Sequence, residues 1–171
     1  MRKVLYILSR LSDTDIEWLA GAGVRRQIPP GFVLVEQGMP ADALIFVLDG
    51  EVAVTVKGIG EVARLGVGEI LGEMSFVDRN PPSATVAATV PSQILAIDRD
   101  AMANRLEADP AFAARFYHAV AMFLSSRLRN TMQKLGEEGV DAHEALNLDM
   151  LETVHVAGAH FDRMIKRLLS V

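Results

Sequence analysis

The sequence contains no cysteine among its 171 residues. This absence excludes disulfide scaffolds, cysteine-ligated zinc, iron–sulfur clusters and thiol nucleophiles together, and it fits a reducing compartment. Histidine is also scarce: the chain has four, and the first of them is His118. A metal site of the cupin type is built from histidine and glutamate on strands. Since residues 1–117 hold no histidine and no cysteine, we expect no metal.

Positive charge is not in excess either. Lysine and arginine number 17 against 22 aspartates and glutamates, and the formal net charge is -5. Proteins that bind nucleic acids generally carry a basic surface, so we expect no nucleic-acid partner. The chain is nevertheless able to fold around a core, because half of its residues are hydrophobic and 23% are charged.

Long apolar runs are missing as well. The longest uncharged run, Asn80 to Ile97, contains Pro81, Pro82 and Pro91, which would break a membrane-spanning helix. The apolar stretch from Val4 to Leu8 is too short for a signal peptide and has no small-residue cleavage site after it. We therefore expect a cytoplasmic protein without a membrane segment.

Turn signals and periodicity divide the chain into three parts. Residues 1–22 are predicted to be helical, with a cap at Ser12 or Asp13 and an end at Gly21 to Gly23. Residues 24–98 hold short apolar runs between turn signals, which predicts six or more strands in a sandwich or barrel. Asp49-Gly50 lies between two such runs and predicts a β-hairpin with a type I′ turn.

The third part, from Asp98 onward, is predicted to be helical. A short helix capped by Asp98 or Asp100 would run through Glu107, and a longer helix would begin at Pro110 and end near Leu135. Gly136 would stop that helix. We accordingly divide the chain into a domain over residues 1–135, with a barrel at about 24–98 and a long helix at about 110–135, and a helical tail over residues 136–171.

The long helix carries two apolar stripes. One stripe has the alternating four- and three-residue spacing of a coiled-coil seam and consists of Tyr117, Ala121, Leu124, Leu128, Thr131 and Leu135. The other could pack on the barrel and consists of Phe112, Phe116, Ala119 and Phe123. A monomer has no evident use for both, so we expect a homodimer through the first stripe. The alternative is that the tail packs there. The tail has a similar stripe, from Met150 to Leu168, which suits internal packing and partner binding equally well.

The most informative segment is Leu71-Gly72-Glu73-Met74-Ser75-Phe76-Val77, which follows a glycine-rich turn. A short helix inserted here between strands would direct its first amides at an anion, with Gly72 allowing close approach of the backbone. The carboxylate of Glu73 would suit a ribose hydroxyl better than a phosphate. Taken alone, the run is a weak signal.

In its context the segment carries a resemblance. Residues 10–135 resemble the cyclic nucleotide-binding domain family, which includes catabolite activator proteins and regulatory subunits of protein kinase A. The landmarks, in order, are Glu36-Gln37-Gly38, Ala41-Asp42, Phe46-Val47-Leu48, Gly50, Val52, Leu65-Gly66, Gly68, Gly72-Glu73 and Ala84-Thr85-Val86. The resemblance implies a mainly β fold: a jelly-roll β-barrel with an N-terminal helix and long C-terminal helices. It also implies a phosphate-binding cassette at residues 71–85.

Within the cassette, the resemblance implies a role for each residue. Glu73, preceded by Gly72, corresponds to the glutamate that binds the ribose 2′-hydroxyl, and the amides of Met74 and Ser75 correspond to those that meet the cyclic phosphate. The family arginine that pairs with this phosphate corresponds to Pro82, and Ser83 and Ala84 follow it at the ligand. Weaker candidates are Arg79, as the nearest cation to the phosphate, and Arg127 and Thr131, from the helix that covers the purine.

The implied function is a non-enzymatic regulatory sensor. It would bind cyclic AMP or cyclic GMP, need no cofactor, and relay the ligand state through its C-terminal helices to a protein partner that the sequence does not identify. After Leu135 too few residues follow for a winged-helix DNA-binding domain. Pro82 supports an alternative: a barrel that has lost nucleotide binding and acts as a structural or protein-interaction module. The sequence leaves open whether a cyclic nucleotide binds.

Overall fold

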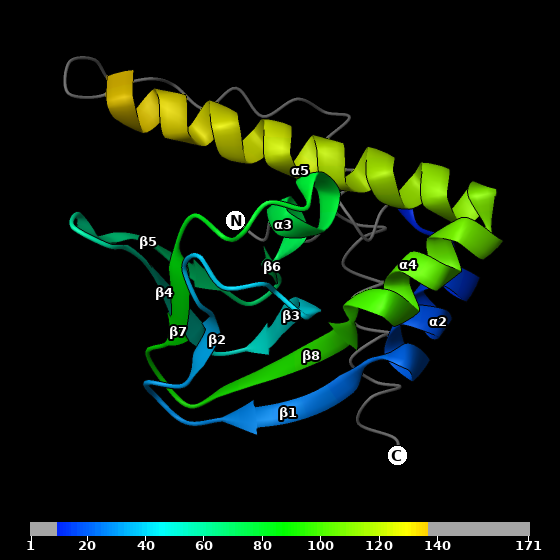
Figure 1. The fold of residues 1–171 in the computed structure, drawn as a ribbon, viewed down its shortest axis with the longest axis horizontal. Helices are drawn as coiled ribbons and strands as arrows, with labels where there is room; N and C mark the ends of the chain where they lie inside the picture. The colour runs from blue at the N-terminus through cyan, green and yellow to red at the C-terminus, as the bar shows by residue number, and fades with distance from the viewer. Residues whose placement is uncertain (1–9, 137–171) are drawn as a thin grey trace.

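The computed structural model describes residues 10–136, without the side chains of residues 130, 131 and 133–136. Its strands form two four-stranded antiparallel sheets with the orders β1-β8-β3-β6 and β2-β7-β4-β5 (Figure 1). These orders confirm the predicted jelly roll. The strands are β1 Val24–Ile28, β2 Val33–Val35, β3 Ala43–Asp49, β4 Glu51–Val56, β5 Gly60–Gly66, β6 Ile70–Leu71, β7 Thr85–Ala88 and β8 Ser92–Asp98.

The predicted hairpin at Asp49-Gly50 is wrong. β3 pairs with β6 and β8, whereas β4 pairs with β5 and β7 in the other sheet. Gly50 has a φ of 95°, and a Cβ atom on it would lie 2.8 Å from the Cα atom of Ser92. At Gly50 the chain therefore passes from one sheet to the other, close to the start of β8. A turn signal shows that the chain reverses, but it does not show which strands then pair.

Four helices flank the roll within the described residues: α2 Asp13–Ala22, α3 Glu73–Asp78, α4 Arg99–Ala108 and α5 Pro110–Gly136. Both caps that the sequence predicts are present. The Ser12 hydroxyl accepts a hydrogen bond from the Asp15 amide at 3.2 Å, and the Asp98 carboxylate accepts one from the Ala101 amide at 2.9 Å. Residues 1–9 and the predicted tail helix lie outside the described part of the chain.

Strand β3 is buried on both faces and so belongs to two cores. Leu44, Phe46 and Leu48 point toward the helices, and the alternating Ile45 and Val47 point into the roll. The helical side of the first core includes the predicted packing stripe Phe112, Phe116, Ala119 and Phe123, all at most 1% exposed. Figure 1 shows α2 and α4 gathered at one end of the roll and α5 crossing over α3.

The predicted coiled-coil stripe of α5 is only partly exposed. Its residues Tyr117 and Leu128 are 46% and 61% exposed, but Leu124 is half-buried against the first core. Met132, which the prediction did not include, is 64% exposed. The side chains of Thr131 and Leu135 lie outside the described residues. The exposed apolar surface of α5 is therefore centred on Leu128 and Met132, one helical turn apart.

An ion pair fixes the start of α5 to α2. Asp15 is 1% exposed, and its two carboxylate oxygens accept hydrogen bonds from Arg115 Nε at 2.7 Å and Nη2 at 2.9 Å. The same carboxylate accepts the Ser12 amide at 2.8 Å, which completes a capping box. Burial raises the pKa of Asp15, but the hydrogen bonds from Arg115 and Ser12 outweigh it and hold the pKa below 3.8.

We expect Asp15→Ala to lower the free energy of unfolding by about 2 kcal/mol, because charge-assisted hydrogen bonds and the cap are lost together. Asp13→Ala, at an exposed position of the same helical turn, is the control and should change stability by less than about 0.5 kcal/mol. Chemical denaturation at pH 7 measures both. The difference should shrink as the pH falls through the lowered pKa of Asp15, because protonation removes its contribution. Equal effects of the two variants would contradict the anchoring role.

Candidate functional site

The cassette begins with a glycine that no other residue replaces easily. Gly72 follows β6 with a φ of 84°, and a Cβ atom on it would lie 2.8 Å from the carbonyl oxygen of Ala43. The chain then turns into α3, whose Phe76 amide donates to the Gly72 carbonyl at 3.0 Å. A side chain would be strained by the positive φ and would press on β3. The position of α3 on the roll thus depends on this residue.

Two carboxylates are buried beside α3, and one arginine from α5 contacts both. Glu73 and Glu69 are 3% and 7% exposed. Arg127 donates from Nη1 to Glu73 Oε1, and its Nη2 lies 3.5 Å from Glu69 Oε2. Its guanidinium group also lies 4.7 Å from the centroid of the Phe123 ring. The long helix therefore reaches the carboxylate that the resemblance predicts to bind a ribose hydroxyl.

Burial raises the pKa of Glu73 above its ordinary value of 4.5, and the neighbouring Glu69 raises it further. The Arg127 guanidinium lowers the pKa, but less than burial raises it. In the folded protein this carboxyl group therefore holds its proton to a higher pH than in the unfolded chain. Its ionisation costs stability, and Arg127 offsets only part of that cost.

This gives a prediction for Glu73→Gln. Between pH 4.5 and the raised pKa, Glu73 holds its proton more in the folded protein than in the unfolded chain, so its contribution makes the free energy of unfolding fall as the pH rises. Glutamine does not titrate, so the variant should show a flatter dependence in this window. Denaturation at several pH values from 4.5 to 7.5 measures the slopes. A variant slope as steep as that of the unmodified protein would show that Glu73 does not cause it.

The second half of the cassette contains the proline that stands where the resemblance places an arginine. Pro82 is buried, and its carbonyl oxygen accepts a hydrogen bond from the Gly38 amide at 2.9 Å. Close by, the Thr85 hydroxyl accepts one from the Gln37 amide at 3.0 Å. The loop between β2 and β3 thus holds this half in place. Ser83 is exposed and Ala84 is half-buried.

Arg79 ends α3 in an unusual conformation. It is the only described non-glycine residue with positive φ, at 60°, and its side chain is exposed. The next residue is held by Asp78, whose carboxylate accepts the Asn80 amide at 2.9 Å. Within the described residues, Glu73 pairs with Arg127 and the Pro82 carbonyl oxygen with the Gly38 amide, so neither of these contacts involves Arg79.

The structure therefore groups most of the predicted site residues around α3. Gly72, Glu73, Met74 and Ser75 form its start, and Arg127 reaches Glu73 from α5. The side chain of Thr131 lies outside the described residues. Sequence reasoning missed Glu69 and Arg99. A glutamate next to an apolar strand was a weak signal for the first, and nothing in the sequence pointed to the contacts of the second with Ser75 and Ala41.

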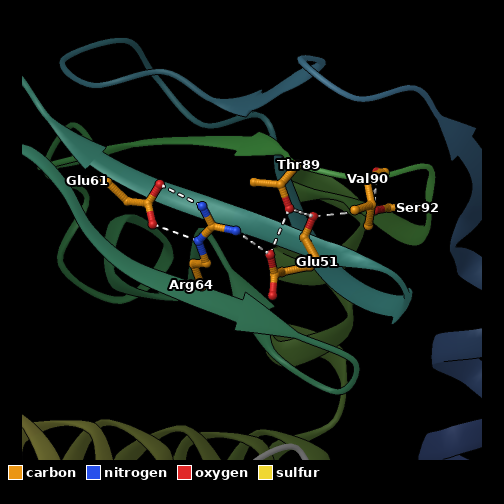
Figure 2. A network of polar contacts seen from close by, with 6 residues as sticks. All are labelled: Glu51, Glu61, Arg64, Thr89, Val90 and Ser92. Carbon is orange, nitrogen blue, oxygen red and sulfur yellow. Dashed lines mark hydrogen bonds and ion pairs between the residues drawn. The ribbon is translucent and has the colours of Figure 1, made fainter.

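A second polar cluster lies on the sheet that contains β4 and β5. Figure 2 shows Arg64 between Glu61 and Glu51, with Nε 2.7 Å from Glu61 Oε1 and Nη1 3.0 Å from Glu51 Oε1. Thr89 donates to Glu51 at 3.0 Å. The charged side chains are 40% to 56% exposed, and exposed ion pairs contribute about 0–1 kcal/mol. None of these residues belongs to the cassette, and we assign them to the pairing of β4 with β5.

The described residues contain neither a metal-binding cluster nor a membrane-spanning helix. No group of three or more histidine, cysteine, aspartate or glutamate side chains is placed to hold a metal ion there. Over the same part of the chain, no helix has the length and apolar character that crossing a membrane requires.

Comparison with known proteins identifies similar chains. Residues 25–109 match the family described as cyclic nucleotide-binding domain. The chain is 33% identical to the cyclic AMP receptor protein of Thermus thermophilus over 70% of its length and 55% of that protein. It is also 33% identical to a regulatory subunit of cAMP-dependent protein kinase from Yarrowia lipolytica, over 57% of its length and 26% of that protein. It thus spans between about a quarter and just over half of these relatives.

A solved structure agrees with this. A cyclic nucleotide-binding domain from Methylobacillus flagellatus superposes with a TM-score of 0.71 at 26% sequence identity, covering 83% of this chain and 85% of that one.

Proposed function

Because residues 25–109 belong to the cyclic nucleotide-binding domain family, we propose that the chain is a non-enzymatic sensor module. It binds cyclic AMP or cyclic GMP at residues 71–85 and relays the ligand state through its C-terminal helices. The observation that carries this proposal is the contact between Arg127 of α5 and Glu73 of the cassette. A ligand at Glu73 must also meet α5, so occupancy and helix position are linked.

The chemistry at Glu73 suits a ribose 2′-hydroxyl. Such a group is both a donor and an acceptor, so it donates to the buried carboxylate of Glu73 and accepts from Arg127. The amides of Met74 and Ser75 begin α3 and meet the cyclic phosphate in this proposal, with Ser83 and Ala84 closing the other side. Pro82 offers the phosphate no side-chain donor, and this limits the affinity.

One observation favours a second function. Pro82 is buried with its carbonyl oxygen already bonded to Gly38, and Glu73 is already paired with Arg127. A cassette whose groups satisfy one another holds its shape without a ligand. In that case the barrel is a structural or protein-interaction module, and the surfaces that it presents belong to its helices.

Calorimetric titration with cyclic AMP, cyclic GMP and, as the control, 5′-AMP separates the two functions. The sensor proposal expects saturable binding of a cyclic nucleotide, much weaker binding of 5′-AMP, and loss of binding in Glu73→Ala. Absence of binding at millimolar cyclic AMP and cyclic GMP would contradict it and favour the interaction module. A folded Glu73→Ala protein, checked by circular dichroism, is required for the comparison.

The wider organisation remains a set of predictions. We propose that residues 1–135 act as the sensing domain, that residues 136–171 form a separate helical tail, and that the chain forms a homodimer through α5. The cytoplasmic location and the absence of a nucleic-acid partner rest on composition and on the net charge of -5.

A further inference from the structure

Arg99, the first residue of α4, contacts two segments far from it in sequence. Its Nη2 donates to the carbonyl oxygen of Ser75 in α3 at 2.9 Å, and its Nη1 donates to the carbonyl oxygen of Ala41 at 3.2 Å. Its guanidinium group lies 5.9 Å from the centroid of the Phe76 ring. Its own amide donates to the Asp42 carbonyl at 3.0 Å. One residue thus joins α3, the loop before β3 and the start of α4.

The contacts of Arg99 lie where α3 ends and in the loop that holds the second half of the cassette. The Ser75 carbonyl also accepts the Arg79 amide at 3.1 Å, so Arg99 holds the turn that ends α3. The loop that contains Ala41 is the one whose Gly38 amide holds the Pro82 carbonyl. Both halves of the cassette are therefore connected to α4 through this side chain and its neighbours.

The junction of α4 with α5 is closely tied. Arg105 of α4 pairs with Asp109 at 3.0 Å and lies 5.3 Å from the ring centroid of Phe112 in α5. Asp109 also caps α5 by accepting the Phe112 amide at 2.9 Å. A displacement of α4 is therefore carried into the start of α5 and not absorbed between the two helices.

We propose that Arg99 is a positioning residue that couples the location of α3 to α4, and through α4 to α5. The ligand part of this inference rests on the proposed function, but the mechanical tie exists without a ligand. It is independent of Arg127, which contacts the cassette from a later part of α5. An arginine suits the task because its planar fork directs two nitrogens at two carbonyl groups. Lysine offers a single nitrogen on a flexible stem, and methionine offers none.

The first test compares Arg99→Met, Arg99→Lys and the control Arg105→Met by residue-resolved amide hydrogen exchange without ligand. Arg105 is in the same helix, but its side chain contacts Asp109, Trp18 and Phe112, which lie outside the cassette. We expect exchange at the Phe76 and Arg79 amides to rise about tenfold in Arg99→Met and less in Arg99→Lys, because one or two hydrogen bonds to α3 and its neighbouring loop are lost. Amides of β3 and β8 should change little. Unchanged exchange in α3, or an equal rise with Arg105→Met, would overturn the proposal.

The second test measures coupling and not stability alone. Gly72→Ala must displace the start of α3, because its Cβ would press on Ala43. We expect this change to alter exchange of the Asp109 amide, which bonds to Arg105, when Arg99 is present, and to alter it much less in the Arg99→Met background. Equal responses in both backgrounds would overturn the coupling.

Neither test uses a nucleotide. A failure of cyclic AMP to bind would thus contradict the sensor function while these results still decide the role of Arg99.

Discussion

Replacing Pro82 by arginine is expected to raise the affinity for cyclic AMP about tenfold or more. A cyclic phosphodiester carries one negative charge, and the amides at the start of a helix typically offset less than about 1 kcal/mol of it at an exposed site. A guanidinium contact with the phosphate contributes more, on the order of 1.5–3 kcal/mol, and is bidentate.

The hydrogen bond at this position does not depend on proline. It uses the carbonyl oxygen of Pro82, which every residue has, so the Gly38 amide keeps its acceptor in Pro82→Arg. Pro81→Arg is the matched control, because it adds the same charge at the neighbouring exposed position. Calorimetry with cyclic AMP on the three proteins measures the effect.

The results for Pro82→Arg separate three situations. Tighter binding by Pro82→Arg than by Pro81→Arg supports a cassette that lacks only its phosphate cation. Submicromolar binding by the unmodified chain would contradict the prediction and point to Arg79 or another group as the replacement. No detectable binding by any of the proteins would contradict it as well and would favour the protein-interaction module.

Substituting the exposed apolar stripe of α5 is expected to convert a homodimer into a monomer. Leu128 and Met132 are more than 60% exposed and lie one turn apart, whereas the buried stripe of the same helix already packs on the roll. In a symmetric dimer the two helices would bury these side chains against each other. The double variant Leu128→Glu with Met132→Glu would bring four carboxylates into that interface, and burying unpaired charges is strongly unfavourable.

The structure shows which leucine of the predicted seam is suited to substitution. Leu124 belongs to the predicted seam, but it packs partly on the core, so Leu124→Glu would lower stability as well as association. The matched control is Ala114→Glu with His118→Glu, which adds the same charge at the same spacing on exposed positions of α5. Sedimentation at tens of micromolar protein measures the mass. We expect a dimer for the unmodified chain and the control, and a monomer for the double variant. A monomeric unmodified chain would contradict the dimer and favour packing of the tail on this stripe.

Much of the fold follows from signals that act over a few residues. The Ser12 and Asp98 caps, the start of α5 at Pro110 and the strand runs depend on contacts within about one turn or on period-two alternation. The same holds for the stripe of phenylalanines on α5, which the helical period places on one face. The order of glycines and apolar runs, together with the family resemblance, was enough to expect a jelly roll.

The residues of the candidate site could be predicted from such local signals only in part. Gly72 and Glu73 stand out in the sequence because a glycine and a carboxylate begin a short helix between strands. The partner of Glu73 lies 54 residues later, on a helix that also has other faces to present. The helical periodicity of α5 shows which residues share a face, but it does not show which face packs against α3. Arg127 was thus expected near a purine base, and Arg99 was not expected at the site.

Local signals in the sequence were enough to predict which residues cap helices and where turns need glycine. These properties depend on covalent structure and on neighbours in the chain, so they can be read in order. The tertiary structure decided which strands pair across Gly50, which side of α5 is buried, and that Arg127 and Arg99 reach the cassette. Such contacts join segments separated by tens of residues, and their free energy depends on how the whole core packs and not on any local pattern.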